Sequence, residues 1–493
     1  MLALLFPPFE LWWLAPLVLL PILSLLSRTK RPLAGAAMGL LFGVGMGLAC
    51  WAWLFPTLTA EFHVARKVAL AVAVAAVATT IWPFAVFGGL TVWMGRSRWI
   101  SWLTPCLAWG AAEWLRVVGI SPWMRLGDAL AGRDVWVQPA AVGGVALLSF
   151  GIVATNALLF EAWQRRRLRA ALAAAMLLAG WGAFGAIRLA LHPLDDTSLR
   201  VGLVQVATPQ HERWTEGSWE RNLERQLRLS EQAQAEGAEL IVWSETAIDT
   251  VPQQIPDLAA RLGRRLEADL VTGLLLERPD GRLTNSVAAF DSDGRRLGHY
   301  DKRVLVPLVE ELPDWVEARP RLRRRLRRLA AETSYARGES SEPLDVAGFK
   351  LGALVCYEAM FPELSRRTVE LGAEILVNVS NDAFFPKRAA AQHAAMGLMR
   401  SVELGRPFLR ASNRGPGFVV DAAGRILSRV GAGEQVARVV DLDPATIDTL
   451  YARGGHGFDE ALFGAALLSA LMVGRRPRSE GVADSSSNSS ASA

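Results

Sequence analysis

Three residues that could cooperate in acyl-group chemistry stand where strands are expected to end in the middle of the chain. Glu245 follows LIVWS, Lys302 follows GHYD, and Cys356 follows LGALV. Because the thiolate is the reactive form of cysteine, a nucleophilic Cys356 needs a base, and Glu245 could take its proton. Attack on a carbonyl leaves negative charge on oxygen, which Lys302 and the backbone N–H of Tyr357 could stabilise. The set therefore predicts a cysteine nucleophile with a carboxylate base and an oxyanion-stabilising cation.

Each of these residues also has an ordinary structural explanation. A glutamate at a strand end is usually a solvated cap, a lysine after a hairpin is usually on the surface, and a cysteine in an apolar run is usually core. Two histidines, His299 and His393, are interpreted as structural. The catalytic interpretation rests on the three residues occurring together.

The cysteine count supports a special role for Cys356. The chain has three cysteines, and Cys50 and Cys106 lie inside apolar segments where a small residue is unremarkable. Cys356 is thus alone in the more polar middle of the chain, without a disulfide partner there. In an oxidising compartment such a thiol is a liability unless it is buried or used.

Strand-like and helical patterns alternate around these residues. Apolar, β-branched runs predict strands at 199–207, 238–245, 268–277, 285–291, 349–358, 373–381, 408–415, 417–424 and 434–442. Helical periodicity appears at 217–236, 254–267, 362–371 and 389–405. Two Asp-Gly pairs, at 280–281 and 293–294, predict hairpins. The pattern predicts a layered α/β domain over 196–456, with its site at the carboxyl ends of strands.

The remaining sequence is typical of a membrane protein. The chain is 51% apolar, and the excess lies before residue 193 and again near 458–474. A bilayer core roughly 30 Å thick needs about 20 apolar residues in a helix. Six segments meet or approach this length, at 5–26, 33–55, 68–94, 99–118, 138–160 and 170–192. We expect a helix bundle over 1–193, a further membrane helix at 457–475, and a disordered cytoplasmic tail at 476–493.

Basic loops predict the orientation of the bundle. Lys and Arg cluster at 27–31, 95–98, 164–169 and 474–478, alternating with weakly charged loops. The excess of positive charge on cytoplasmic loops places these clusters inside the cell and residues 193–457 outside it, in the periplasm of a didermal bacterium. The net charge of +5 is explained by the same loops, so we expect no nucleic-acid partner.

The ordered segments VWSETAI, YDKRVLVPLVEELP and LVCYEAMFPE resemble the Glu-Lys-Cys signature of the nitrilase superfamily. That resemblance implies an α-β-β-α sandwich of the carbon–nitrogen hydrolase type. With membrane helices on both sides, nearly the whole chain is similar to the apolipoprotein N-acyltransferase family. That family acts in the bacterial inner membrane, where it moves an acyl chain from a phospholipid to the α-amino group of a diacylglyceryl-cysteine apolipoprotein.

The resemblance implies a role for each matching residue. Glu245 matches the family's general base, Lys302 its oxyanion-stabilising lysine and Cys356 its nucleophile. Glu310, eight residues after the lysine, matches an essential glutamate. No metal and no other cofactor is implied.

Four further residues are nominated by the same resemblance. Tyr357 and Glu358 match the residues that follow the nucleophile, as supporting groups. Trp214, in VQVATPQHERW, matches a tryptophan that lines the site, and Phe384 lies in the segment after NDA. Both are predicted to contact substrate.

The chain departs from the family pattern beside the chemistry. The family usually has Pro in place of Ser244, Phe-Gly in place of 308–309, and Trp-Phe-Gly in place of 384–386. These positions affect loop shape and acyl fit more than the three reactive groups. The family also typically has one more membrane span upstream, so either the start is assigned too far downstream or the chain is a shorter paralogue.

The implied cycle is ping-pong, through a thioester on Cys356. Two alternatives stay open. One is a membrane-bound amide or nitrile hydrolase that uses the same residues on a soluble substrate. The other is a catalytically weakened paralogue that binds lipoproteins.

Overall fold

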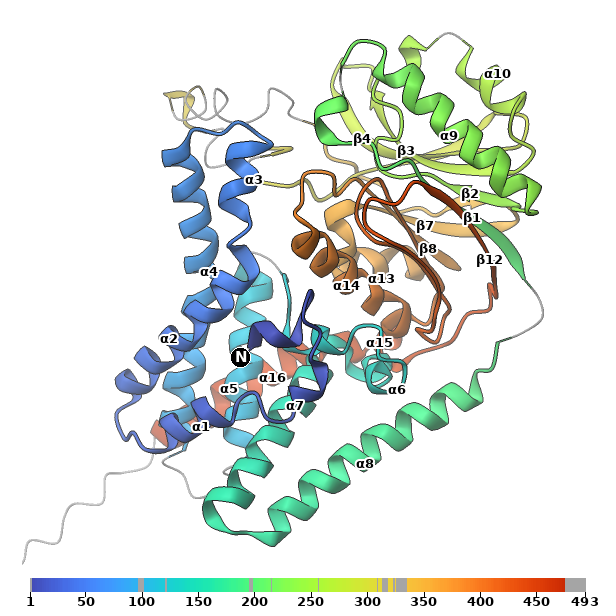
Figure 1. Ribbon diagram of the computed structural model, residues 1–493. Helices are drawn as coiled ribbons and strands as arrows, with labels where there is room; N and C mark the ends of the chain where they lie inside the picture. Colours follow the sequence, from blue (N-terminus) through green and yellow to red (C-terminus); the bar gives the residue numbers. More distant parts are fainter. Residues whose placement is uncertain are drawn as a thin grey trace, which may run out of the picture.

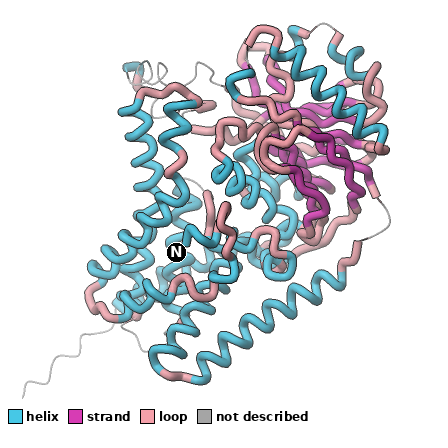
Figure 2. The backbone as a smooth tube through the Cα atoms, viewed as in Figure 1, coloured by secondary structure: helices cyan, strands magenta, loops and turns pink. Residues whose placement is uncertain are grey.

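The computed structural model places two structural parts side by side, a helix bundle and an α/β domain (Figures 1 and 2). The residues that it describes are 2–95, 102–119, 122–194, 198–213, 215–255, 257–307, 309–312, 318–321, 324 and 335–474. Trp214 and the predicted tail 476–493 lie outside these described residues.

Within the described residues, five helices are long and apolar enough to cross a membrane. They are Pro32–Ala60, which comprises α2 (Pro32–Trp51) and α3 (Leu54–Ala60), then α4 (Arg66–Met94), α7 (Ala140–Arg165), α8 (Leu168–Leu191) and Gly455–Val473, which contains most of α16 (Phe458–Gly474). A sixth apolar helix, α5 (Leu103–Gly119), is shorter and packs against α4, α7 and α16. These helices coincide with six of the seven apolar segments of the sequence.

The first apolar segment does not form the continuous span expected over 5–26. The chain there makes two short 3₁₀ helices, η1 (Leu2–Leu5) and η2 (Trp12–Leu14), and an eight-residue helix α1 (Leu20–Ser27). Eight residues of helix rise only about 12 Å, well short of a bilayer core. Prolines at positions 7, 8, 16 and 21 explain the breaks, because each removes a backbone donor and restricts the preceding residue.

Glycines allow α2 and α4 to pack backbone against backbone. A Cβ atom at Gly39 would lie 2.0 Å from the carbonyl oxygen of Phe84, and one at Gly88 would lie 2.1 Å from that of Gly35. Small residues at such crossings let membrane helices approach closely. Just after the end of α2, Trp53 packs on Phe385 of the α/β domain, with ring centres 4.9 Å apart.

The α/β domain contains two six-stranded sheets. The first has the order β12 (Val436–Leu442), β1 (Leu199–Gln205), β2 (Leu240–Val242), β3 (Asp269–Glu277), β4 (Leu283–Phe290), β5 (Arg296–Asp301). The second has the order β11 (Ile426–Val430), β10 (Gly417–Val420), β9 (Phe408–Ser412), β8 (Ile375–Ser380), β7 (Phe349–Val355), β6 (Leu344–Val346). In each sheet three neighbouring strands are parallel, β1–β2–β3 and β7–β8–β9, and the outer pairs are antiparallel.

Four layers result, and they confirm the predicted α-β-β-α sandwich. Val201, Val242, Val377 and Leu409 belong to the buried apolar core between the sheets. The first sheet is covered on its outer face by α9 (Ser218–Ala235) and α10 (Leu258–Gly263). The second is covered by α13 (Pro362–Glu370) and α14 (Lys387–Leu404), which lie between this sheet and the helix bundle (Figure 1).

The sequence patterns missed three strands, and all three are edge strands. β5 forms one edge of the first sheet, and β6 and β11 form both edges of the second. Edge strands bury fewer side chains, so their sequences lack the apolar pattern that identified the central strands. The two Asp-Gly turns do join β3 to β4 and β4 to β5 as expected. The helix expected over 254–267 is shorter than predicted, because only η5 (Pro252–Gln254) and α10 form there.

Candidate active site

Cys356 lies on a sharp turn between a strand and a helix. It directly follows β7 and opens the short 3₁₀ helix η6 (Cys356–Met360) with a φ of +52°. A positive φ is uncommon for a residue with a side chain, and strained residues of this kind cluster at active sites. The side chain is buried, and Ser380 Oγ donates to its Sγ at 3.4 Å.

Glu245 is held by hydrogen bonds to both of its carboxylate oxygens. Asn285 Nδ2 donates to Oε1 at 2.7 Å, and the backbone N–H of Asn381 donates to Oε2 at 2.8 Å. Gly273 on β3 lets the backbone of Glu245 approach, because a Cβ there would lie 2.5 Å from the Glu245 Cα. The carboxylate is thus held from two separate segments of the chain, and the backbone of Glu245 packs against a third.

Lys302 is fully buried between two carboxylates. Its Nζ lies 2.8 Å from Glu310 Oε1 and 3.7 Å from Glu245 Oε1. Burial disfavours the charged lysine, but the charges of Glu310 and Glu245 outweigh it and hold the pKa of Lys302 above its ordinary value. The lysine is therefore a permanent ammonium group, as an oxyanion-stabilising cation must be.

The Cys356 thiol is protonated in the resting site. Burial raises its pKa well above its ordinary value, the charge of Glu245 raises it further, and Lys302 lowers it in part. The thiol therefore does not ionise at neutral pH by itself, and attack on a substrate requires a group that accepts its proton. The Glu245 carboxylate is near enough to raise the pKa of the thiol by its charge, and it can accept the thiol proton as a general base.

The raised thiol pKa predicts the pH dependence of alkylation. Only the thiolate reacts with iodoacetamide, and its fraction grows with pH until the pKa is reached. Because the pKa of Cys356 lies above 9.0, we expect the alkylation rate to be still rising at pH 9. The measurement is mass spectrometry of the intact protein with Cys50 and Cys106 replaced by alanine. A rate that levels off near pH 7 would contradict the assignment of a protonated resting thiol.

Glu358 braces the turn that carries Cys356. Its carboxylate accepts hydrogen bonds from Tyr300 Oη at 3.0 Å and from the backbone N–H groups of Arg303, Val304 and Val355 at 2.7, 3.0 and 2.8 Å. It therefore joins the segment after Lys302 to the residue before Cys356. The arrangement fits a supporting group, because four protein donors already occupy the two carboxylate oxygens.

Replacing Glu358 by alanine should destabilise the domain strongly. One buried and two partly buried backbone N–H groups and one buried hydroxyl would lose their acceptor, at about 1–3 kcal/mol for each unsatisfied buried group. We expect the free energy of unfolding to fall by at least about 3 kcal/mol, measured by denaturant unfolding in detergent. Glu363→Ala, on the exposed first turn of α13, is the matched control and should change the stability little. Equal stability of the two variants would exclude the bracing role.

Phe384, nominated for substrate contact, and Tyr357, nominated as a supporting group, lie at the junction with the helix bundle. Tyr357 packs on Phe361 with ring centres 4.9 Å apart, and Phe384 packs on Phe62 at 5.3 Å. Phe385 contacts Trp53 of the bundle at 4.9 Å. Aromatic side chains therefore connect the segment after the cysteine with the apolar helices.

Trp214 lies outside the described residues, but its neighbour Arg213 is described. Arg213 forms a buried ion pair with Asp249 at 2.6 Å and donates to Asn381 Oδ1 at 3.2 Å. Since the backbone N–H of Asn381 binds Glu245, this contact brings the segment before Trp214 to the edge of the site.

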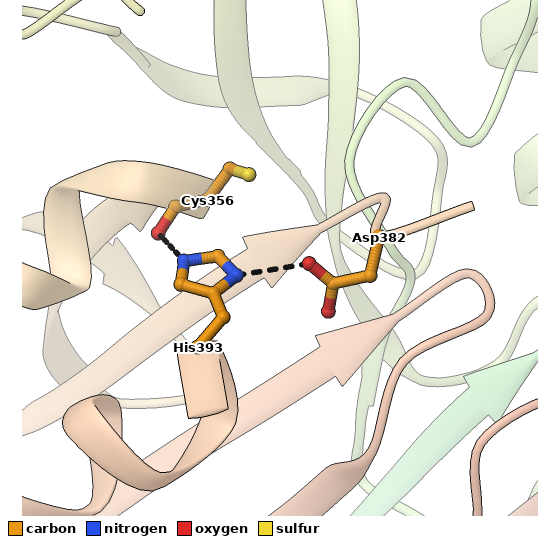
Figure 3. Close-up of side chains that lie close together, drawn as sticks. All are labelled: Cys356, Asp382 and His393. Carbon is orange, nitrogen blue, oxygen red and sulfur yellow. Dashed lines mark hydrogen bonds and ion pairs between the residues drawn. The ribbon is translucent and has the colours of Figure 1, made fainter. Parts of the chain in front are cut away.

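Two residues beside Cys356 were missed or dismissed in the sequence. His393 lies next to the cysteine turn, with Nε2 3.2 Å from the Cys356 carbonyl oxygen and Nδ1 2.9 Å from Asp382 Oδ1 (Figure 3). Asp382 in turn binds Arg410 at 2.7 Å. Neither AAAQHAAM nor NDAFF has a chemical signature, so only the fold could reveal this cluster.

Cys356, Asp382 and His393 have donor atoms close enough together to hold a metal ion, within 4.8 Å of one another. Both ring nitrogens of His393 already face protein groups, and Asp382 is paired with Arg410. A metal would have to displace these contacts, so the cluster fits a hydrogen-bond network better than a metal centre.

Comparison with known proteins accounts for both structural parts. Residues 200–452 match the carbon-nitrogen hydrolase family, and residues 1–158 match the apolipoprotein N-acyltransferase N-terminal domain. An apolipoprotein N-acyltransferase of Gloeobacter violaceus is 32% identical over 486 residues, which cover 96% of this chain and 91% of that protein. The chain belongs to the apolipoprotein N-acyltransferase family. A relative of the same name from Bordetella bronchiseptica is 33% identical over 75% of this chain and 73% of its own.

Membership of the apolipoprotein N-acyltransferase family makes this chain a membrane-embedded acyltransferase that modifies lipoproteins on nitrogen, with several membrane helices. The α/β domain is also similar to solved structures of nitrilase type. The match with an amidase from Nesterenkonia sp. covers 53% of this chain and 95% of the amidase chain, at 22% sequence identity and a TM-score of 0.40.

Proposed function

We propose that Cys356 carries an acyl chain, as a thioester, from a membrane phospholipid to the α-amino group of a diacylglyceryl-cysteine apolipoprotein. One observation carries the proposal. Glu245, Lys302 and Cys356 come from three distant segments and meet in one buried site, with one carboxylate, one ammonium and one thiol. This is the complement that thioester chemistry needs.

In the first half-reaction Cys356 Sγ attacks an ester carbonyl carbon of the phospholipid. The thiol proton passes to Glu245, and the oxygen that becomes negative is stabilised by Lys302 and by the backbone N–H of Tyr357. The tetrahedral species collapses as the ester C–O bond breaks. The departing oxygen takes the proton from Glu245 and leaves as a lysophospholipid.

In the second half-reaction the free α-amine of the apolipoprotein attacks the thioester carbonyl. A new C–N bond forms, Glu245 accepts a proton from the amine, and the C–S bond breaks. The thiolate recovers that proton, and the triacylated product departs. Glu310 keeps Lys302 in place through both halves by its ion pair at 2.8 Å.

The apolar surroundings support a lipid as the acyl donor. Met360 of η6 and Met396 and Met399 of α14 belong to the same apolar cluster as the helices of the bundle. Arg388 of α14 also donates to the carbonyl of Ala49 in α2. Keeping an acyl chain out of water stabilises it by about 0.8 kcal/mol for each buried CH₂. We therefore expect the phospholipid to reach the site laterally from the bilayer, with its chain in apolar surroundings throughout.

The proposed location is the bacterial inner membrane, with the α/β domain on the periplasmic side. The proposed domains are a bundle over 1–193, a catalytic domain over 196–456 and a membrane helix over 457–475. In support, α2 begins and α7 ends at the end of the bundle that lies away from the α/β domain (Figure 1). Basic clusters at 27–31 and 164–169 stand at these ends, as cytoplasmic loops require.

The test is to incubate the purified protein with a phospholipid of defined chain length and to measure its intact mass. We expect one acyl adduct on Cys356, which disappears when a diacylglyceryl-cysteine peptide is added and reappears as an amide on that peptide. An adduct that water removes equally fast without the peptide would identify a hydrolase instead. A protein that never forms the adduct would exclude the thioester.

A further inference from the structure

The peptide group that follows the proposed nucleophile is held on its carbonyl side. The carbonyl oxygen of Cys356 lies 3.2 Å from His393 Nε2 and 3.3 Å from Asn378 Nδ2 (Figure 3). A carbonyl oxygen can only accept, so His393 Nε2 must carry a hydrogen and donate it. His393 of α14 and Asn378 of β8 therefore both donate to the carbonyl oxygen of Cys356.

These two hydrogen bonds to the Cys356 carbonyl determine the direction of the Tyr357 N–H bond. In a planar trans peptide the C=O and N–H bonds point in opposite directions. With the Cys356 carbonyl turned toward His393, the N–H of Tyr357 is turned away from it. Figure 3 shows that Sγ of Cys356 also points away from His393. The thiol and this N–H thus face the same side, where a substrate carbonyl would be attacked.

We propose that His393 is a positioning residue that locks the peptide between Cys356 and Tyr357, so that the Tyr357 N–H is aimed at the oxyanion. This inference rests on the proposed acyl transfer through Cys356. Without the lock, the peptide could rotate and place its carbonyl oxygen where the negative charge develops. The oxyanion would then lose a donor and gain a repulsive dipole.

The backbone at this turn needs such a restraint. Cys356 has a φ of +52°, and a residue with a side chain reaches this region only where its surroundings impose it. Rotation of the peptide that follows changes the ψ of Cys356 and the φ of Tyr357 and leaves this φ unchanged, so the turn by itself does not fix where that peptide points. The hydrogen bond from His393 opposes that rotation from the carbonyl side.

His393 is itself held firmly. With the hydrogen on Nε2, its Nδ1 is an acceptor and lies 3.1 Å from the donor Arg410 Nη2, which also binds Asp382 at 2.7 Å. Its ring stacks on Trp123 of the bundle, with 6.1 Å between centres and 14° between planes. Arg410 also binds the side-chain oxygen of Asn378, which leaves the amide nitrogen of Asn378 facing the Cys356 carbonyl. The two donors to the carbonyl are therefore oriented by one shared arginine.

Two reactions of the same thiol separate the proposed role from a general structural one. Acylation by a phospholipid passes through an oxyanion, whereas alkylation by iodoacetamide displaces iodide from a saturated carbon and forms none. His393→Phe keeps a ring against Trp123 and removes the N–H, and His393→Gln restores a donor. In the wild-type protein and each variant, the acylation rate, its dependence on phospholipid concentration and the alkylation rate are measured by intact mass. Cys50 and Cys106 are replaced by alanine throughout.

For His393→Phe we expect the maximal acylation rate to fall on the order of 10²-fold, as for loss of one oxyanion donor. The half-saturating phospholipid concentration and the alkylation rate should stay near the wild-type values. His393→Gln should recover most of the loss, and His299→Phe, at an exposed histidine of β5, should behave as wild type. If His393→Phe does not fold, His393→Leu is used for the same comparison.

Two results would overturn the inference. One is an unchanged acylation rate in His393→Phe, and the other is an equal fall in acylation and alkylation, which would mean that His393 acts on the thiol or on the fold. Failure of the proposed function looks different, because the wild-type protein would then form no acyl adduct at all.

Discussion

Replacing Cys356 by alanine is expected to abolish acyl transfer, with a loss of at least about 10⁴-fold. The acyl chain would have no atom to reside on between donor and acceptor, and no other cysteine in the described residues lies in the α/β domain. The fold should tolerate the change, because alanine fits the buried position and only the contact of Sγ with Ser380 is lost. The measurements are the intact mass after incubation with phospholipid and the transfer rate to a diacylglyceryl-cysteine peptide.

The matched control is Cys106→Ala, which removes another buried cysteine from α5. It should retain both the adduct and the transfer rate. Cys356→Ser is informative as well, since its hydroxyl is a far weaker nucleophile than a thiolate at the same place. An acyl adduct that persists in Cys356→Ala would place the acyl carrier elsewhere in the chain.

Replacing Glu245 by glutamine is expected to slow acylation by about 10²–10⁴-fold, the contribution typical of general acid–base catalysis. The resting thiol holds its proton because burial and Glu245 raise its pKa, so attack depends on a base at this position. Glutamine has the same shape but cannot accept the proton. In the native protein Asn285 and the Asn381 N–H each donate to one carboxylate oxygen. In the variant the amide NH₂ group would replace one of these oxygens, so one of the two donors would lose its acceptor.

The loss in Glu245→Gln should be a loss of rate and not of structure. Lys302 keeps its ion pair with Glu310 at 2.8 Å, so the buried ammonium stays paired. The matched control is Glu277→Gln, at the exposed carboxyl end of the neighbouring strand β3, and it should leave the rate unchanged. Single-turnover acylation followed by mass gives the rate, and thermal unfolding in detergent gives the stability. A rate within tenfold of wild type would exclude Glu245 as the base.

Much of the site could be predicted from local pattern. Strand-like runs end at or near Glu245 and Cys356, and the carboxyl ends of strands are where α/β folds build their sites, whereas β5, which ends just before Lys302, was missed. Composition likewise located the apolar helices, because a membrane span needs a long run of apolar residues. The exception is 5–26, where prolines break an apolar run into short pieces.

The partners of these residues could not be predicted in the same way. Asn285 and Asn381 lie in ordinary polar positions of the sequence, yet each donates to Glu245 from a different sheet or loop. Tyr300 reaches Glu358 across 58 residues of chain. Such contacts depend on how the two sheets stack, and the stacking cannot be predicted from the spacing of residues along the chain.

The sequence by itself determined the reactive residue types, the α/β pattern and the membrane segments, because each is written in local composition and periodicity. The tertiary structure alone decided the charge state of the site. It buries Lys302 between two carboxylates and removes the Cys356 thiol from water, and burial with nearby charge is what shifts a pKa. It also brought His393, which looks like a core histidine in the sequence, to within 3.2 Å of the carbonyl oxygen of Cys356, because α14 packs against the turn that carries this cysteine.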